Sequence, residues 1–136
     1  MSLLLTQPQI QSKQHVLALK KGQPERPSLH RMFMAFEVLR ATEREFPAQL
    51  VSTFLYICTH NGCRQEELME ATSMSSSSVS RNVNWLGPKH RIKDREGLKW
   101  IYREVDPIDP KRYRLYLSRK GEQIAKLLEK TLESPV

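Results

Sequence analysis

The side chains with the clearest capacity for specific binding are Arg81 and Asn84, which lie three positions apart in this chain. An arginine guanidinium can donate two parallel hydrogen bonds to guanine O6 and N7, and an asparagine amide can pair with adenine or reach a phosphate. Short hydroxyl side chains that could bond phosphates or base edges lie beside this pair, at Ser76, Ser77, Ser78 and Ser80. For each serine, helix capping and exposure to solvent are an equally good explanation.

The spacing of apolar residues predicts that these side chains lie on a helix. Val79, Val83 and Leu86 recur at i, i+4 and i+7, which indicates a helix with an inward apolar side and with Ser75 or Ser76 as its cap. The arginine and the asparagine then fall on or near the outer face. A run of four serines could instead be a linker, but a linker would not continue into a clean helical period.

A shorter helix is predicted before this one, over about residues 64–71, with a polar turn at 72–74. Together the two helices form a predicted helix-turn-helix over about 64–86. A helix that is apolar inside and polar outside can rest on its own protein while its outer face enters the DNA major groove. Arg64 and Gln65 begin the first helix, where free backbone N–H groups favour an anion such as a phosphate.

A β-hairpin, or wing, is predicted next, over about residues 97–118. Residues 98–105 are rich in strand formers, 106–112 hold two prolines and two aspartates typical of a turn, and 113–118 alternate between apolar and polar residues. The cations near its tip could hold the DNA backbone and the minor groove. They are Lys111, Arg112 and Arg114. A solvated charged turn is the alternative interpretation.

Positive charge is concentrated in one part of the chain. The 136 residues carry a net charge of +7, from 22 Lys and Arg and 15 Asp and Glu. Residues 81–121 alone hold 12 basic and 5 acidic side chains, so the rest of the chain is neutral. A basic segment on a neutral body indicates a polyanion as partner, although a basic loop without a ligand would have the same composition.

The flanking segments complete a predicted mainly α fold with a small β-hairpin (α+β), a winged helix-turn-helix with N- and C-terminal helices. Residues 1–27 mix Gln, Lys and Pro and are expected to form a loosely ordered N-terminal arm. One winged helix-turn-helix domain is expected over 28–136, and helical spacing begins at 28–46. Its C-terminal helix is predicted at about 118–133, with Ser118 as the cap.

Other functional classes have little support in the sequence. It contains no Gly-rich phosphate loop, nucleophile elbow or His-Glu-x-x-His motif, so we assign no catalytic residue and no cofactor. Cys58 and Cys63 lack the second ligand pair of a structural zinc site, so no metal is expected. No apolar run is long enough for a membrane, and the N-terminus lacks the basic region of a signal peptide. We therefore expect a cytoplasmic protein.

In the order of these parts the sequence resembles the MarR-like winged-helix regulators, over about residues 45–122. The matching stretches are Gln-Glu-Glu-Leu-Met-Glu-Ala at 65–71, Ser-Val-Ser-Arg-Asn-Val-Asn-Trp-Leu at 78–86, Gly-Leu at 97–98, and Asp-Pro-Lys-Arg-Tyr-Arg-Leu-Tyr-Leu-Ser-Arg-Lys-Gly at 109–121. The last is similar to the Asp-Arg-Arg wing tip of the family, followed by Leu-Thr-x-x-Gly.

Two departures from the family pattern concern the wing. The first wing-tip arginine of the family falls on Pro110 here, and the second is kept in kind as Lys111. Insertion into the minor groove would therefore use Lys111 or Arg112. The connector between Leu86 and Gly97 is also longer than is usual in the family. Family members generally dimerise through helices from both chain ends, which implies a homodimer.

The resemblance and the charge together predict a sequence-specific transcriptional regulator, a repressor, with double-stranded DNA as its partner. Its two recognition helices would enter successive major grooves of an inverted repeat. The same features fit a replication or partition DNA-binding protein of a plasmid or virus, and a winged-helix protein–protein adaptor is a third hypothesis. No cluster of residues marks a pocket for a small-molecule effector, so none is assigned.

Overall fold

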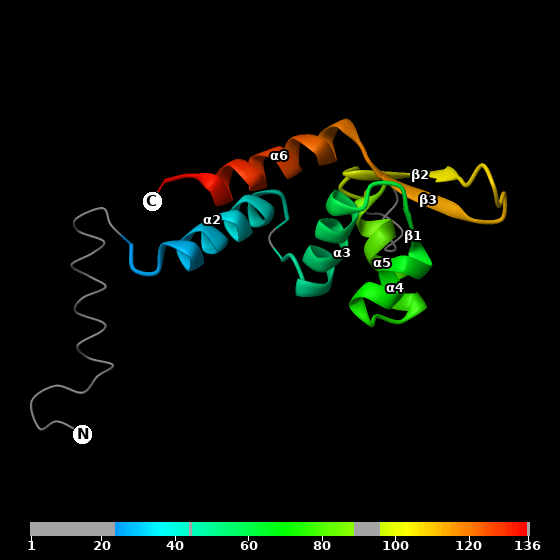
Figure 1. The fold of residues 1–136 in the computed structure, drawn as a ribbon, viewed down its shortest axis with the longest axis horizontal. Coiled ribbons are helices and arrows are strands. Elements are labelled where there is room, and N and C mark those ends of the chain that lie inside the picture. Colours follow the sequence, from blue (N-terminus) through cyan, green and yellow to red (C-terminus); the bar gives the residue numbers. More distant parts are fainter. Residues whose placement is uncertain (1–23, 44, 89–95, 136) are drawn as a thin grey trace, which may run out of the picture. The chain divides into compact units, whose positions relative to one another are not determined.

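The structure, a computed structural model, describes residues 24–43, 45–88 and 96–135. These residues form helices and three short strands (Figure 1), which confirms the predicted mainly α fold with a small β element. In chain order the elements are α2 (Pro27–Thr42), α3 (Ala48–Thr59), β1 (Cys63–Arg64), α4 (Gln65–Thr72), α5 (Ser76–Leu86), β2 (Ile101–Val105), β3 (Tyr113–Leu117) and α6 (Arg119–Glu133). Most of the predicted arm at 1–27 and of the charged connector after α5 lies outside the described residues.

The chain divides into two compact units. The larger unit is Glu43–Leu127, and the smaller unit combines the residues up to Thr42 with those from Leu128 onward. Within the smaller unit, Arg31 on α2 donates from Nε to the backbone oxygen of Ser134 at 2.7 Å. The same helix exposes large apolar side chains, at Leu29, Met32, Phe33 and Met34. It therefore has uncovered apolar surface.

The core of the larger unit is built around α3 and α5. Phe54 on α3 and Trp100 are both fully buried, and their ring centroids lie 4.9 Å apart. On α5 the predicted inward residues Val79, Val83 and Leu86 are all buried, which confirms the helical period. Burial of an aliphatic side chain of this kind contributes about 1.5–3 kcal/mol. The packed inner face of α5 thus fixes the direction of its outer face.

A three-stranded antiparallel sheet in the order β1-β3-β2 carries the wing. β3 pairs with β2 from Ile101–Leu117 to Val105–Tyr113 and with β1 along its other edge. The predicted hairpin is present, but β1 could not be predicted from the sequence, because a strand of two residues has no alternating pattern. β2 also begins later than predicted, since Lys99 has a φ of 62°, in the left-handed region that interrupts extended chain.

Ser118 and Gly121 connect the sheet to α6. As predicted, Ser118 caps the helix, since its Oγ accepts the backbone N–H of Gly121 at 3.1 Å. The same hydroxyl donates to the carbonyl oxygen of Lys99 at 2.6 Å. A Cβ at position 121 would lie 1.9 Å from the carbonyl oxygen of Trp100, so this close approach requires glycine. The first turn of α6 is therefore fixed beside the start of β2.

Candidate nucleic-acid interface

The outer face of α5 brings most of the predicted helix residues together. An open hollow on this face is lined by Ser77, Ser80, Arg81 and Asn84. The Arg81 side chain is exposed, and its Nη2 donates to Ser78 Oγ at 3.2 Å. By helical geometry this face is opposite the buried valines. One exposed place on the helix thus offers a cation, an amide and two hydroxyls to a partner.

The first turn of α5 is held by its own serines. Ser75 Oγ accepts the backbone N–H of Ser78 at 3.1 Å, so Ser75, and not Ser76, is the N-cap. Ser75 Oγ also donates to Ser78 Oγ at 3.1 Å. Capping therefore accounts in part for Ser78, whereas Ser76 and Ser77 are exposed in the first turn.

Asn82 lies on the inward side of α5 and has a structural role that the sequence analysis did not assign. It is buried, and its Nδ2 donates to Oγ1 of the buried Thr53 at 3.3 Å and to Met74 Sδ at 3.5 Å. A buried amide is costly unless it is hydrogen-bonded, so these contacts specify how α5 packs on α3. The sequence pattern could have indicated that Asn82 is buried, because it follows Val79 by three residues and so lies on the same face of the helix.

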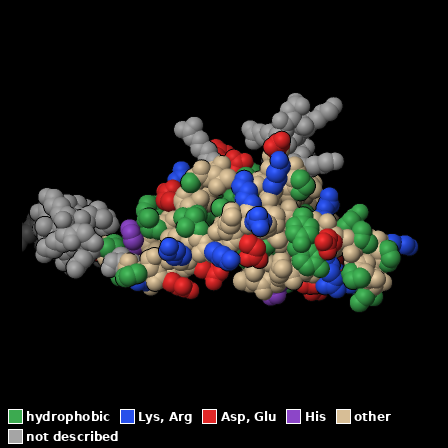
Figure 2. All heavy atoms as spheres, turned by 90° about the horizontal axis from the view of Figure 1, so that it is seen from above, with side chains coloured by type: hydrophobic (Ala, Val, Ile, Leu, Met, Phe, Trp, Pro, Cys, Tyr) green, Lys and Arg blue, Asp and Glu red, His purple; other side chains and the backbone are tan. Residues whose placement is uncertain are grey.

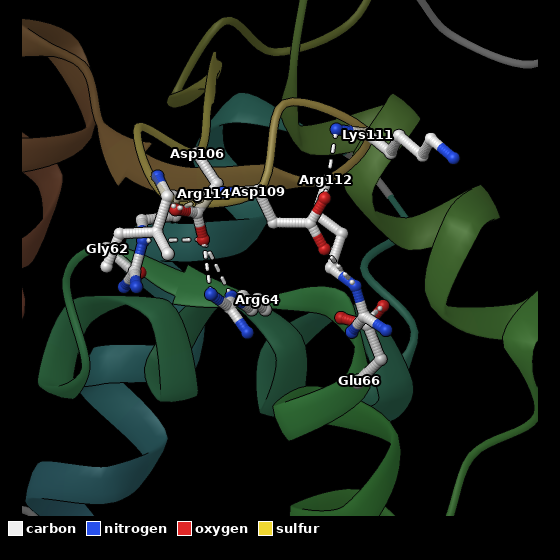
Figure 3. Close-up of polar contacts among 9 residues, drawn as sticks. Gly62, Arg64, Glu66, Asp106, Asp109, Lys111, Arg112 and Arg114 are labelled. Atoms are coloured by element: carbon white, nitrogen blue, oxygen red, sulfur yellow. Dashed lines mark hydrogen bonds and ion pairs between the residues drawn. The ribbon is translucent and has the colours of Figure 1, made fainter.

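The wing is organised around one buried carboxylate, that of Asp106 (Figure 3). Its Oδ2 accepts from Arg64 Nε and Nη2 at 2.8 and 2.5 Å and from Arg114 Nε at 3.1 Å. Its Oδ1 accepts the backbone N–H groups of Ile108 at 2.8 Å and of Asp109 at 3.4 Å. One side chain therefore joins β1, β3 and the turn at the wing tip.

These contacts hold the pKa of the Asp106 carboxyl at about 2, below its ordinary value of 3.8. The backbone N–H of Ile108 is the largest cause, and the hydrogen bond from Arg64 lowers the pKa further, while burial acts in the opposite direction. The same hydrogen bond raises the pKa of Arg64. Both groups therefore stay charged across the neutral range.

A second set of contacts ties the wing tip to α4. Arg112 Nη1 lies 3.0 Å from Glu66 Oε1 in the first turn of α4, and Arg112 Nε lies 3.1 Å from Asp109 Oδ2. The backbone N–H of Lys111 donates to Asp109 Oδ1 at 3.2 Å. The Lys111 ammonium makes no ion pair or hydrogen bond with any residue that the structure describes, and Figure 3 shows it pointing away from the cluster. It is exposed and available to a partner.

Like Arg112, two further predicted DNA contacts have internal carboxylate partners. Arg64 and Arg114 use their guanidinium groups on Asp106, and Arg114 Nη1 also donates to the carbonyl oxygen of Gly62 at 3.0 Å. Their side chains are 28% and 31% exposed. Gln65, at the start of α4, is half-buried. Contact of these three residues with DNA stays a prediction, and the internal role of the two arginines is a finding of the structure.

A helix-turn-helix followed by a β-hairpin and a C-terminal helix defines the winged-helix class of fold, and solved structures share it. The S. aureus MepR–DNA complex matches with a TM-score of 0.60 at 21% identity, over 76% of this chain and 71% of that chain. The transcriptional regulator Tm0710 from Thermotoga maritima gives 0.57 at 22%, over 75% and 67%. MarR gives 0.55 at 24%, over 98% and 74%.

At these identities the likeness is one of fold. The fold is that of the MarR-type winged-helix proteins, as the sequence resemblance predicted. No protein-family model matches the sequence, and a search of curated proteins gave no match.

The described part of the chain does not contain the arrangement of side chains that a reactive thiol or a metal site would need. Cys63 is buried in β1, and burial raises the pKa of its thiol to about 11, so it is protonated at neutral pH. Among residues 24–43, 45–88 and 96–135, no three His, Cys, Asp or Glu side chains are grouped so that they could hold a metal ion. Within the same ranges, no helix combines the length and the apolar character needed to cross a membrane.

Asp106→Asn tests the buried cluster through the pH dependence of stability. Because the pKa is about 2 in the folded protein against an ordinary 3.8, the carboxylate stabilises the native state above about pH 4. This contribution is lost as the pH falls towards about 2. We expect the wild type to melt at a higher temperature than the variant at neutral pH, and the difference to shrink over that acidic range.

Circular dichroism melts at a series of pH values measure this difference. Glu104→Gln, which removes an exposed carboxylate from β2, is the matched control and should track the wild type. A gap between wild type and Asp106→Asn that stayed constant down to about pH 2 would contradict the role of this carboxylate.

Proposed function

We propose that this protein is a transcriptional regulator, a repressor, that binds double-stranded DNA in a sequence-specific way. The observation that carries the proposal is the hollow on α5, where Arg81 and Asn84 lie together with two serines while the opposite face is buried. Such a helix can enter the major groove and present donors to base edges. The likeness in fold to MepR, solved in complex with DNA, supports this role.

In the mechanism we favour, each side chain has a defined task. Arg81 donates two hydrogen bonds to guanine, Asn84 bonds adenine or a phosphate, and the small serines let α5 approach the bases closely. Lys111 holds the backbone of the flanking DNA. The ion pair between Arg112 and Glu66 joins the wing tip that carries this lysine to the first turn of α4. Binding alone performs the function, so we assign no catalytic residue and no cofactor.

We further propose that the regulator is a homodimer. Leu29, Met32 and Phe33 on α2 are 57%, 51% and 54% exposed, and Leu132 on α6 is 49% exposed. Clustered exposed apolar side chains of this size favour burial against another chain. A two-fold dimer would present two copies of α5 to half-sites about 10 bp apart in an inverted repeat.

Selection of binding sites from a random duplex library, with Arg81→Ala beside the wild type, tests the base contact. We expect the wild type to enrich an inverted repeat. Loss of the bidentate contact should cost Arg81→Ala about 1–3 kcal/mol and blur the preference at one position of each half-site. Arg40→Ala is the matched control, since it removes the same charge from α2, where Arg40 pairs with Glu37.

Each other outcome of this selection has a distinct meaning. If Arg81→Ala kept both affinity and preference, the assignment of the recognition face would be wrong. Enriched direct repeats would favour a replication or partition protein. Retention of DNA without enrichment would indicate a non-specific binder, and no retention at all would leave the protein–protein adaptor.

Phe33→Asp tests the dimer. The side chain is exposed, so the variant should fold, while a charge in an apolar contact between two chains should separate them. By sedimentation equilibrium we expect the wild type near twice its chain mass of 15.9 kDa and Phe33→Asp near the chain mass itself. Ser28→Asp adds the same charge at an exposed polar position of α2 and should remain dimeric. A monomeric wild type would contradict the proposal.

A further inference from the structure

The wing tip is apolar as well as basic. Figure 2 shows hydrophobic side chains gathered at its right-hand side, where the wing lies. Ile108 is 83% exposed, and Val105 and Tyr113, paired across β2 and β3, are 52% and 49% exposed. Pro107 and Pro110 are exposed in the same turn. A single exposed aliphatic residue is ordinary, but a run of them at one projecting tip is typical of a contact surface.

The backbone that carries Ile108 is held in place. Its N–H donates to Asp106 Oδ1 at 2.8 Å, and the N–H of Asp106 donates to the carbonyl oxygen of Arg112 at 2.9 Å. The N–H of Arg112 donates to the carbonyl oxygen of Asp109 at 3.0 Å, which closes the turn. The turn therefore presents Ile108 at a defined position, so binding through this residue would cost little further ordering.

The charges around Ile108 limit what the tip can bind. Arg112 is paired with Glu66 and Asp109, and Arg114 is paired with Asp106. Of the three cations predicted for the wing, only Lys111 has no partner within the described residues. Arg103 on β2 is also exposed, and its guanidinium carbon lies 5.3 Å from the centroid of the Tyr113 ring. The tip thus combines available cations with an aliphatic side chain. Proteins that bind the DNA minor groove often use this combination, in which Arg or Lys reads the groove and an apolar side chain enters it, frequently between base steps.

We propose that Ile108 packs against the floor of the minor groove next to the site of α5 and makes the wing sensitive to the base pairs there. This inference rests on the proposed function. The floor of the groove at a G·C pair carries the guanine 2-amino group, which A·T pairs lack. An aliphatic side chain against that group would leave a donor without a partner. Ile108 therefore disfavours guanine where the wing binds.

Three variants separate an apolar contact from an ionic one. Ile108→Ala, Ile108→Leu and Lys111→Gln are titrated with the duplex that the wild type selects, over a range of salt concentrations. Ile108→Ala should bind roughly fivefold more weakly at every salt concentration, because the loss of an apolar contact leaves counterion release unchanged. Ile108→Leu should stay within about twofold of the wild type. Lys111→Gln should instead reduce the salt slope by about one contact.

Inosine tests the groove itself, because it lacks the 2-amino group and keeps the major-groove acceptors of guanine. Duplexes with G·C, I·C or A·T at the flanking position are compared. We expect the wild type to bind the I·C and A·T duplexes more tightly than the G·C duplex, and Ile108→Ala to bind all three alike.

The other outcomes distinguish the two proposals. If the wild type bound no duplex, the proposed function and this inference would both fall. If the wild type bound the duplex and Ile108→Ala bound it equally well, only the inference about Ile108 would be wrong. The apolar tip would then be better explained as a surface that contacts another protein. A loss in Ile108→Ala with a reduced salt slope, or an equal inosine effect in both proteins, would also overturn the inference.

Discussion

The buried carboxylate of Asp106 is the interaction on which the wing depends. It is reached by Arg64 from β1, by Arg114 from β3 and by the backbone N–H of Ile108 at the tip, so three segments converge on two oxygen atoms. An ionised carboxylate that is fully buried requires partners of this kind, whereas the two arginines keep part of their side chains exposed to solvent. Without it, β1 would lose its link to the tip, and the turn would lose the acceptor that shapes it.

This arrangement divides the basic residues of the wing by task. The charge excess of the sequence indicates a polyanion partner, but a count of cations overstates those available to it. Arg64, Arg112 and Arg114 have carboxylate partners, and of the three cations predicted near the wing tip only Lys111 forms no ion pair with a described residue. In the proposed function, base recognition depends mainly on α5, where Arg81 is exposed, and the wing adds a smaller contact beside it. In the structure, three of the cations that the sequence suggests for DNA contact thus form ion pairs within the protein.

The parts of the fold that could be predicted from the sequence are determined by patterns among a few neighbouring residues. The helical period of α5, its serine cap, the hairpin and the cap of α6 all depend on neighbours close in the chain. The hydrogen bond between Arg64 and Asp106 joins residues 42 positions apart in the chain, and the one between Asn82 and Thr53 joins residues 29 positions apart. No local pattern predicts such pairs. Strand β1 was missed because its two residues are extended only through pairing with β3.

Amide hydrogen exchange on the wild type and Asp106→Asn tests the central claim, that this carboxylate holds the wing as a rigid extension of the helix-turn-helix. Exchange reports local opening residue by residue. We predict that protection falls in the variant at the backbone N–H groups of Ile108 and Arg112, while the amides of α5 keep theirs. Unchanged protection at the wing tip would contradict the account, as would an equal loss across the wing and α5.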